Sequence, residues 1–419
     1  MHILVLAYKS ILNRKFTLAL TIFSISLSIM LLLGVERLRN DARESFTNTI
    51  SGTDLIVGAR SGPVQLLLYS VFRIGNPTNN ISWKSYEDIR SQQLVAWTIP
   101  LSLGDSHQGF RVLGTDLNYF RHYRYTGDRG IEFSEGAPFA GVYDAVIGAD
   151  VAEELNYRIS QEIVLAHGTG KVSFVKHDDK PFRVVGILQR TGTPIDRTVH
   201  VSLEGIEAIH VGWNNGSPTS ASQIHADNAR QMDLQPTTLT AVLVGLKSRI
   251  TAFRMQRLIN DYPEEPLLAV LPGVALQELW DTMAIGQDAL FAISILVVLV
   301  GISGMATAIL TSLNERRREM AVLRSVGAQP WHVFVLFVGE SGAIMAISAL
   351  IGMAVLYIVQ WIARPIIQTQ LGLFLPINPP SSHELLLLAA AFGAGLLVGL
   401  IPAYRAYRYS LADGMTIRL

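Results

Sequence analysis

Residues 313–327 read LNERRREMAVLRSVG, a charged stretch held between two long apolar runs. Its apolar residues fall on one stripe at helical spacing, with the arginines opposite: Leu313, Met320, Leu323 and Val326. Gly327 suits the left-handed position just after a helix, and Pro330 suits the first position of the next helix. The stretch therefore predicts an amphipathic helix, a tight corner and a new helix. Such a basic helix cannot lie in lipid, so it belongs at a membrane face.

Four segments are long and apolar enough to cross a bilayer, which takes about 20 helical residues. We place them at residues 16–36, 285–313, 331–363 and 384–404. The apolar part of the first is about 20 residues long rather than the 7–15 of a secretory signal, and no small-residue cleavage pattern follows it. We interpret it as a retained span.

The orientation follows from Lys and Arg in the short flanks. The basic flanks are residues 1–15, 314–330 and 405–419, and with four spans all three fall on one side. That side is predicted to be cytoplasmic. Residues 37–284 and the short loop 364–383 are then predicted to be periplasmic.

Composition excludes several classes of function. The 419 residues are 49% apolar and only 16% charged, with 34 basic and 34 acidic side chains. No cysteine is present, which excludes disulfides, thiol nucleophiles and thiolate metal sites. Between Glu36 and Asp288 there are 23 Lys and Arg against 29 Asp and Glu, so the outer region is mildly acidic and is not a nucleic-acid binder.

The outer region has the pattern of an α+β domain carried on helical stalks. Helical stretches at 36–50 and 275–288 are predicted to extend the first two spans. Strands are predicted at 53–59, 94–103, 109–114, 162–166, 182–188, 199–202 and 238–246, with a strand, a turn and a helix over 144–156. Further helices are predicted at 83–91 with Ser82 as N-cap, 203–209 and 250–262. Residues 213–235 are predicted to form a loop.

These parts, in this order, resemble a known family: the permease subunits of MacB-type, mechanotransmitting (type VII) ABC transporters, related to lipoprotein-releasing and FtsX-like permeases. NERRREMAVLRSVGAQPWHVFVLFVGES is similar to the coupling helix and third span of that family, and IPAYRAYRYSLADGMTIRL to its fourth-span exit. DAVIGADVAEELNYRISQEIVLA, FRVVGILQRTGTPIDRTVHVSL and RVLGTDLNYF resemble its periplasmic core domain. The resemblance implies four transmembrane helices with a large α+β periplasmic domain between the first and second.

The resemblance also implies a function. The chain would be a non-catalytic permease subunit that couples ATP hydrolysis by a separate ATPase to a change in its periplasmic domain, driving export, extraction or release of a periplasmic or membrane substrate. It would take no cofactor itself, because ATP would be bound by the partner. One Gly-Lys pair, Gly170-Lys171, resembles part of a phosphate loop. It does not fit the full pattern, because Leu165 stands where the pattern requires Gly and Val172 where it requires Ser or Thr. The alternative is an FtsX-like, non-transporting regulator that activates a periplasmic enzyme.

The implied partners are a cytoplasmic ABC ATPase dimer, a second permease copy (a homodimer rather than a heterodimer), membrane lipid and, as an open case, a periplasmic substrate-binding or adaptor protein. The expected ATPase-docking residues lie on the coupling helix: Asn314, Glu315, Arg316, Arg317, Glu319, Met320, Leu323, Arg324 and Gly327. The alternative for this helix is an anchor whose arginines bind lipid phosphates.

Glu340, about two turns into the third span, is the one buried charge that we expect in the spans. Intramembrane acids suggest a function, here proton coupling. A structural hydrogen bond near the cytoplasmic interface is the interpretation we favour. Glycines in the spans are expected at close helix contacts: Gly301, Gly304, Gly342, Gly352, Gly393, Gly395 and Gly399.

The outer region shows no catalytic constellation. No nucleophile and base pair or carboxylate dyad is evident. Thr191 to Arg197 is predicted to be a turn with Asp196 and Arg197 paired or capping. His200, His210 and His225 have no metal-ligand spacing, so we expect them to be structural or solvated and we expect no metal site.

Overall fold

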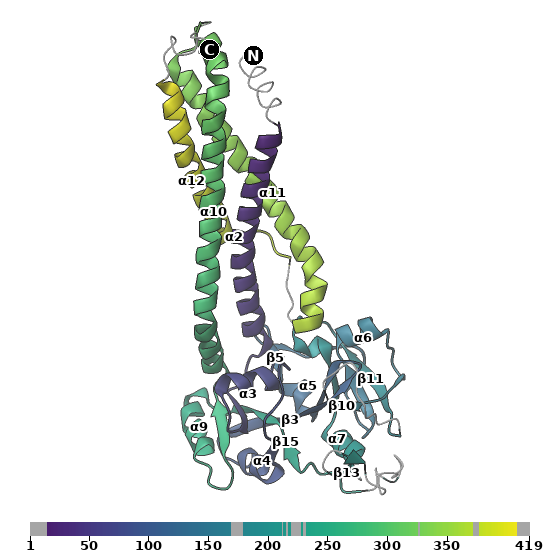
Figure 1. Cartoon of the computed structure of the whole chain (residues 1–419). Coiled ribbons are helices and arrows are strands. Elements are labelled where there is room, and N and C mark those ends of the chain that lie inside the picture. The colour runs from purple at the N-terminus through teal and green to yellow at the C-terminus, as the bar shows by residue number, and fades with distance from the viewer. Residues whose placement is uncertain are drawn as a thin grey trace. The chain divides into compact units, whose positions relative to one another are not determined.

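The computed structural model describes residues 15–168, 179–211, 213–214, 217–218, 228, 232–325, 327–371 and 377–408. Within them the chain forms two compact units (Figure 1). The membrane unit comprises the described residues of Met1–Asp41, Met283–Ile366 and Pro376–Leu419. The ectodomain unit comprises those of Ala42–Thr282 and Ile367–Leu375.

Four long helices carry the apolar segments. They are α2 (Lys15–Thr49), α10 (Pro272–Ser325), α11 (Pro330–Leu371) and α12 (Ser382–Tyr407). Each contains an 18-residue window with a mean hydropathy between 2.3 and 2.5, as the four predicted spans require. α2 and α10 run past the predicted ends of their spans without a break, to Thr49 and from Pro272. The two predicted helical extensions are therefore present.

Small side chains let the helices of the membrane unit approach closely. A Cβ added at Gly352 of α11 would lie 2.7 Å from the Ser26 carbonyl oxygen of α2. One added at Gly399 of α12 would lie 2.3 Å from Ser341 Oγ of α11. Gly395, Gly301 and Gly342 also face a neighbouring helix, whereas Gly304 and Gly393 face open space. The expectation of close contacts is thus confirmed for five of the seven span glycines.

The ectodomain is built on an eleven-stranded mixed sheet, counted over the described residues. Its strands follow the order β17-β1-β16-β3-β4-β12-β8-β11-β7, with β10 paired to β3 and β9 to β11. β4 and β12 are parallel, as are β8 and β11, and the other pairs are antiparallel. The bounds are β1 Leu55–Ala59, β3 Val95–His107, β4 Phe110–Thr115, β7 Phe133–Gly136, β8 Asp144–Ile147, β9 Glu162–Ile163, β10 Ala166–His167, β11 Phe182–Leu188, β12 Thr198–Ser202, β16 Ala241–Leu246 and β17 Leu267–Val270.

Within the described residues, short helices and three two-stranded ladders accompany this sheet. The helices are α3 Pro63–Ser70, α4 Trp83–Arg90, α5 Asn118–His122, α6 Ala149–Leu155, α7 Leu203–His210 and α9 Ala252–Asn260, with 3-10 turns η1 Pro194–Arg197 and η2 Arg249–Thr251. The ladders pair β2 Ile81–Ser82 with β15 Thr238–Leu239, β5 Arg124–Tyr125 with β6 Arg129–Gly130, and β13 Trp213–Asn214 with β14 Ser217–Pro218.

Most of the predicted elements are present, and the structure adds several short elements that were not predicted, among them α5 and β7. Ser82 caps α4 as predicted, because its side chain accepts a hydrogen bond from Ser85 N. The predicted strand 162–166 is in fact two short strands, β9 and β10, which pair with different neighbours. β17 and α3 were not predicted, since short apolar runs do not separate helix from strand. Most of the predicted loop 213–235 lies outside the described residues.

The ectodomain ends of α2 and α10 are embedded in the core of that unit. Phe46 of α2 lies 4.3 Å from Phe72 and 5.5 Å from Trp280 of α10, measured between ring centroids. Tyr123 donates a 2.8 Å hydrogen bond to the Thr49 carbonyl at the end of α2. Ala275 of α10 is fully buried in the same hydrophobic cluster. The final turns of these helices are therefore part of the folded domain.

We expect Gly352→Ala to destabilise the chain by about 1–3 kcal/mol, because the new methyl group overpacks the contact with Ser26. Gly393→Ala is the matched control, since a Cβ there meets nothing within 4 Å and alanine favours helix. Thermal unfolding in mild detergent measures both. Equal melting temperatures for the two variants would contradict the close helix contact.

Candidate functional site

The predicted coupling segment continues α10 up to a corner. α10 remains helical to Ser325, while the side chains of residues 314–325 and the whole of Val326 lie outside the described residues. The ATPase-docking assignment of Asn314, Glu315, Arg316, Arg317, Glu319, Met320, Leu323 and Arg324 therefore remains a prediction. Gly327 has φ +98°, and Pro330 is the first residue of α11. Both features of the predicted corner are confirmed.

The start of α11 is fixed by local contacts. His332 Nδ1 accepts a 3.0 Å hydrogen bond from Gln329 N, which caps the first turn. The His332 ring stacks on Trp331 at 3.9 Å, and Trp331 is 52% exposed. One turn on, Val333 and Phe337 are buried in the core of the membrane unit. The corner thus has a defined geometry and presents an exposed aromatic pair.

Glu340 lines a cavity of about 550 Å³ between α2, α10 and α11. Hydroxyl groups are frequent on its walls, and those of Thr21, Thr307 and Thr311 donate to carbonyls of their own helices at 2.9 Å. Their hydrogen-bonding capacity is met within the helix, so this surface can face lipid or another helix. The placement of Glu340, half-buried at the cavity wall, leaves both interpretations of this acid open.

A buried ion pair joins α2 to α12, and the sequence did not predict it. Arg37 Nε and Nη2 donate to the two carboxylate oxygens of Glu384 at 2.8 and 2.7 Å. Arg37 is 7% exposed and Glu384 4% exposed. The expectation that Glu340 is the one buried charge of the spans was therefore wrong. The pair was missed because its partners are 347 residues apart in sequence.

The remaining polar atoms of this ion pair also have partners. Arg37 donates to Gln360 Oε1 at 3.2 Å, and its guanidinium lies 4.8 Å from the ring centroid of Tyr357. Ser381 and Glu384 form a capping box at the start of α12. Three of the four long helices are thus joined at one end of the membrane unit. The Ser-x-x-Glu pattern of residues 381–384 indicates the start of a helix. It does not indicate that Glu384 pairs with Arg37.

In the ectodomain, Asp196 and Arg197 stabilise a turn, as predicted. Asp196 is 2% exposed and accepts hydrogen bonds from Thr191 N and Gly192 N, both at 2.8 Å. Burial raises the pKa of Asp196 to about 6, against those hydrogen bonds. Arg197 pairs with Glu154 and lies 4.7 Å from the ring centroid of Phe110. The loop is structural and has no free donor set for a ligand.

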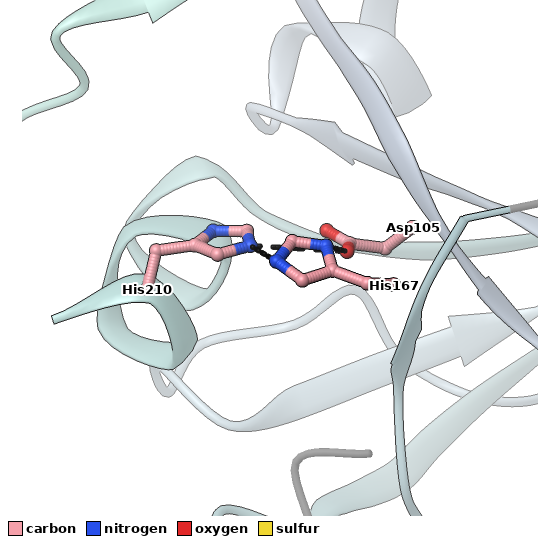
Figure 2. A group of neighbouring side chains, drawn as sticks. All are labelled: Asp105, His167 and His210. Atoms are coloured by element: carbon pink, nitrogen blue, oxygen red, sulfur yellow. Dashed lines mark hydrogen bonds and ion pairs between the residues drawn. The ribbon is translucent and has the colours of Figure 1, made fainter. Parts of the chain in front are cut away.

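The histidines of the ectodomain separate into two groups. His200 is fully buried, its Nδ1 lies 3.3 Å from the Val146 carbonyl oxygen, and burial lowers its pKa to about 3. It is a core residue, as expected. His210, which we expected to be structural or solvated, lies 3.2 Å from His167 between the Nε2 atoms, with Asp105 next to the pair (Figure 2). His225 lies outside the described residues.

Comparison with protein families accounts for almost the whole chain. The model described as "MacB-like periplasmic core domain" matches residues 18–260, and the model described as "FtsX-like permease C-terminal" matches residues 291–411. The first match covers more than half of the chain. The chain belongs to the MacB-like family of ABC transporter permeases. It is accordingly a multi-pass membrane protein with a periplasmic domain, inserted between the first and second of the four span-capable helices.

Curated relatives of this MacB-like permease are distant. A macrolide export ATP-binding/permease protein MacB of Marinobacter nauticus is 23% identical over 96% of the chain and 58% of the relative. A pyoverdine export ATP-binding/permease protein PvdT of Pseudomonas fluorescens is 22% identical over 73% of the chain and 42% of the relative. The chain thus spans about half the length of these relatives. An uncharacterised ABC transporter permease of Methanocaldococcus jannaschii is 23% identical over 67% of the chain.

Two solved ectodomains are also similar to this permease. The periplasmic region of MacB from Actinobacillus actinomycetemcomitans aligns with 55% of the chain at 9% identity and a TM-score of 0.34. The extracellular domain of the transporter YknZ aligns with 52% at 12% identity and a TM-score of 0.31.

We expect Arg37→Met to destabilise the chain by about 3–5 kcal/mol, because Glu384 is then left buried without its partner. The double variant Arg37→Met/Glu384→Leu should recover a large part of this loss, since no unpaired charge remains. Unfolding in mild detergent of the wild type, both single variants and the double variant measures the coupling energy. Additive losses would show that the two side chains are not energetically coupled.

We expect His200 to make the stability of the chain sensitive to acid. Its folded-state pKa of about 3 lies below the ordinary 6.5, so its contribution is present above pH 6.5 and is lost as the pH falls toward 3. Between pH 7 and pH 5 the loss is about 2 kcal/mol. His200→Gln should flatten the pH dependence of the unfolding free energy over this interval, whatever its effect at pH 7. If His200→Gln leaves the slope of the unfolding free energy against pH unchanged, His200 is not the group that makes the chain sensitive to acid over this interval.

Proposed function

We propose that this chain is a non-catalytic permease subunit that works as a dimer and converts ATP hydrolysis in the cytoplasm into a change of its periplasmic domain. A separate ATPase subunit docks on residues 314–327. The motion drives export, extraction or release of a substrate located in the periplasm or the membrane. The chain lies in the bacterial inner membrane with both termini in the cytoplasm.

The continuity of α10 is the observation that carries this proposal. One helix runs from Pro272, in the ectodomain unit, through an apolar span to Ser325 in the predicted coupling segment. An unbroken helix transmits displacement along its axis, because each turn is hydrogen-bonded to the next. A force applied near Ser325 therefore reaches residues that belong to the ectodomain.

The ectodomain end of α10 supports the same proposal. Trp280 and Ala275 are packed into the ectodomain core, and Phe46 brings α2 into the same packing. A close-packed core responds to displacement as a unit rather than by local yielding. Movement of these two helices is therefore expected to move the whole ectodomain rather than one part of it.

In this proposal ATP is bound by a partner subunit. The names of the two bacterial relatives combine "ATP-binding" with "permease". The sequence at Gly170-Lys171 lacks the Gly and the Ser or Thr of a phosphate loop. We therefore place the nucleotide in a partner ATPase dimer and assign no cofactor of transport to this chain.

Transport is preferred to regulation because two of the relatives are named for export, one of macrolides and one of pyoverdine. The cavity lined by Glu340 and by hydroxyl groups satisfied within their own helices offers a surface for the second copy of the permease. An adaptor or substrate-binding partner in the periplasm is compatible with this arrangement.

The docking segment is tested by affinity purification from mild detergent, followed by mass spectrometry of the proteins that co-elute. We expect an ABC ATPase in stoichiometric amount with the wild type and its loss with Arg316→Ala/Arg317→Ala/Glu319→Ala. The reason is that the variant removes the charged face of the segment while keeping a helix-forming residue at each position.

The matched control is Arg405→Ala/Arg408→Ala, which removes two basic residues from the predicted cytoplasmic tail. Retention of the ATPase by the control and its loss from the triple variant separates docking from general attraction of basic residues to lipid. Equal loss in both variants would favour the lipid-anchor interpretation. Absence of an ATPase from the intact wild-type dimer would overturn the proposed function.

A further inference from the structure

Three side chains of the ectodomain converge where a strand pair meets the end of a helix (Figure 2). Asp105 is on β3, and His167 stands directly opposite it on β10, since the two residues are register partners. His210 is the last residue of α7. The group was hidden in the sequence, because its members are separated by 62 and 43 residues. Regular elements of the fold therefore hold all three ligand-type side chains.

Hydrogen bonding indicates which nitrogen of His210 carries the proton of the neutral ring. Its Nδ1 lies 2.8 Å from the Ile206 carbonyl oxygen, which can only accept, so Nδ1 carries the proton of the neutral ring. The Nε2 lone pair is then directed toward His167, whose Nε2 is 3.2 Å away. A backbone carbonyl or carboxylate on the second ring nitrogen is the usual support of a metal-binding histidine.

Asp105 supplies the negative charge of the group. Its side chain is 3% exposed. Oδ1 forms an ion pair with His167 Nδ1 at 2.8 Å and lies 3.8 Å from His210 Nε2. A buried carboxylate favours positive charge beside it, which a protonated His167 or a bound cation can supply. The two histidine side chains are 30% and 28% exposed, so an ion can reach the group from solvent.

One ligand atom from each of the three side chains lies within 4.8 Å of the others. Ligand atoms about 2.0–2.2 Å from one metal lie at most about 4.4 Å apart, and about 3.4 Å apart in a tetrahedral site. His210 Nε2 is 3.2 Å from His167 Nε2 and 3.8 Å from Asp105 Oδ1, and both distances fall within this limit. By contrast, His107, two residues along β3 from Asp105, has both ring nitrogens occupied, by the Val164 carbonyl and the Tyr157 hydroxyl. It is excluded as a ligand.

We infer that Asp105, His167 and His210 bind a divalent transition-metal ion in the periplasmic domain. Two imidazoles and one carboxylate favour borderline ions such as Zn²⁺, Cu²⁺ or Ni²⁺ over Mg²⁺ or Ca²⁺. Three protein ligands leave a coordination position open for water or an incoming donor.

The ion would also connect two parts of the ectodomain. β10 is only two residues long and contacts the sheet through β3, while α7 packs on the other strands through Ile206 and Ile209. A shared ion adds a bond between the short strand and the helix end. Occupancy of the site is therefore expected to stabilise the folded ectodomain by mass action.

The test uses the full chain in mild detergent, purified with a tag that contains no histidine and treated with a chelator. Equilibrium dialysis against Zn²⁺ followed by metal analysis should give about one more ion per wild-type chain than per chain of His167→Gln/His210→Gln. His122→Gln is the matched control, because His122 stacks on Trp97 away from the group and should leave binding unchanged. Asp105→Asn should weaken the affinity at least tenfold.

A second readout is the melting temperature of the wild type, which Zn²⁺ should raise and a chelator should restore, with no effect of Mg²⁺. This arm holds even where a variant folds poorly. If the wild type binds no more Zn²⁺ than the double variant and its melting temperature does not move, the two histidines share a proton and no metal. That result overturns the inference and leaves the proposed transport function untouched.

Discussion

A helix that crosses lipid must satisfy its own backbone hydrogen bonds, and the rest of this structure depends on that constraint. Each unpaired N–H or C=O in the bilayer costs several kcal/mol, so α2 and α10 cannot break inside it. Both continue as helix until they enter the ectodomain unit, at Thr49 and Pro272. α10 is followed by a corner at Gly327, where the backbone adopts a positive φ. These helices therefore end where water or folded protein can form hydrogen bonds with the unpaired backbone N–H and C=O groups.

The ion pair of Arg37 and Glu384 shows a second effect of the same environment. A charge near lipid is tolerated when a partner and further hydrogen bonds satisfy it, here Gln360 and the face of Tyr357. Replacing such a pair by apolar residues is often neutral or even stabilising, so its value is not simply energetic. A bidentate pair permits only one relative placement of α2 and α12, and helices packed through small residues have few other features that set their register. The pair thus specifies the arrangement of the helix bundle.

Features that depend on neighbours in sequence could be predicted. The Ser82 cap, the Gly327 and Pro330 corner and the four spans each follow from a few adjacent residues or from a long apolar run. Features that depend on register could not. His167 faces Asp105 only because β10 separates from β9 and pairs with β3, whereas the apolar pattern of 162–166 is equally consistent with one strand. The predicted coupling segment is an intermediate case, since its helical state was predictable and is present to Ser325, whereas its docking on an ATPase remains a prediction.

The same distinction explains why the proposed metal ligands and the helices that we propose to transmit movement occupy different kinds of structure. Transmission requires long continuous elements, and a helix of 54 residues is recognisable from its composition alone. Ligand geometry requires side chains from separate elements to meet within a few ångströms, and the mixed sheet provides this by bringing β3, β10 and the end of α7 together. An ion at that point would act on the shape and stability of the ectodomain without touching α2 or α10. Metal binding would then influence the ectodomain separately from any movement that the membrane helices transmit to it.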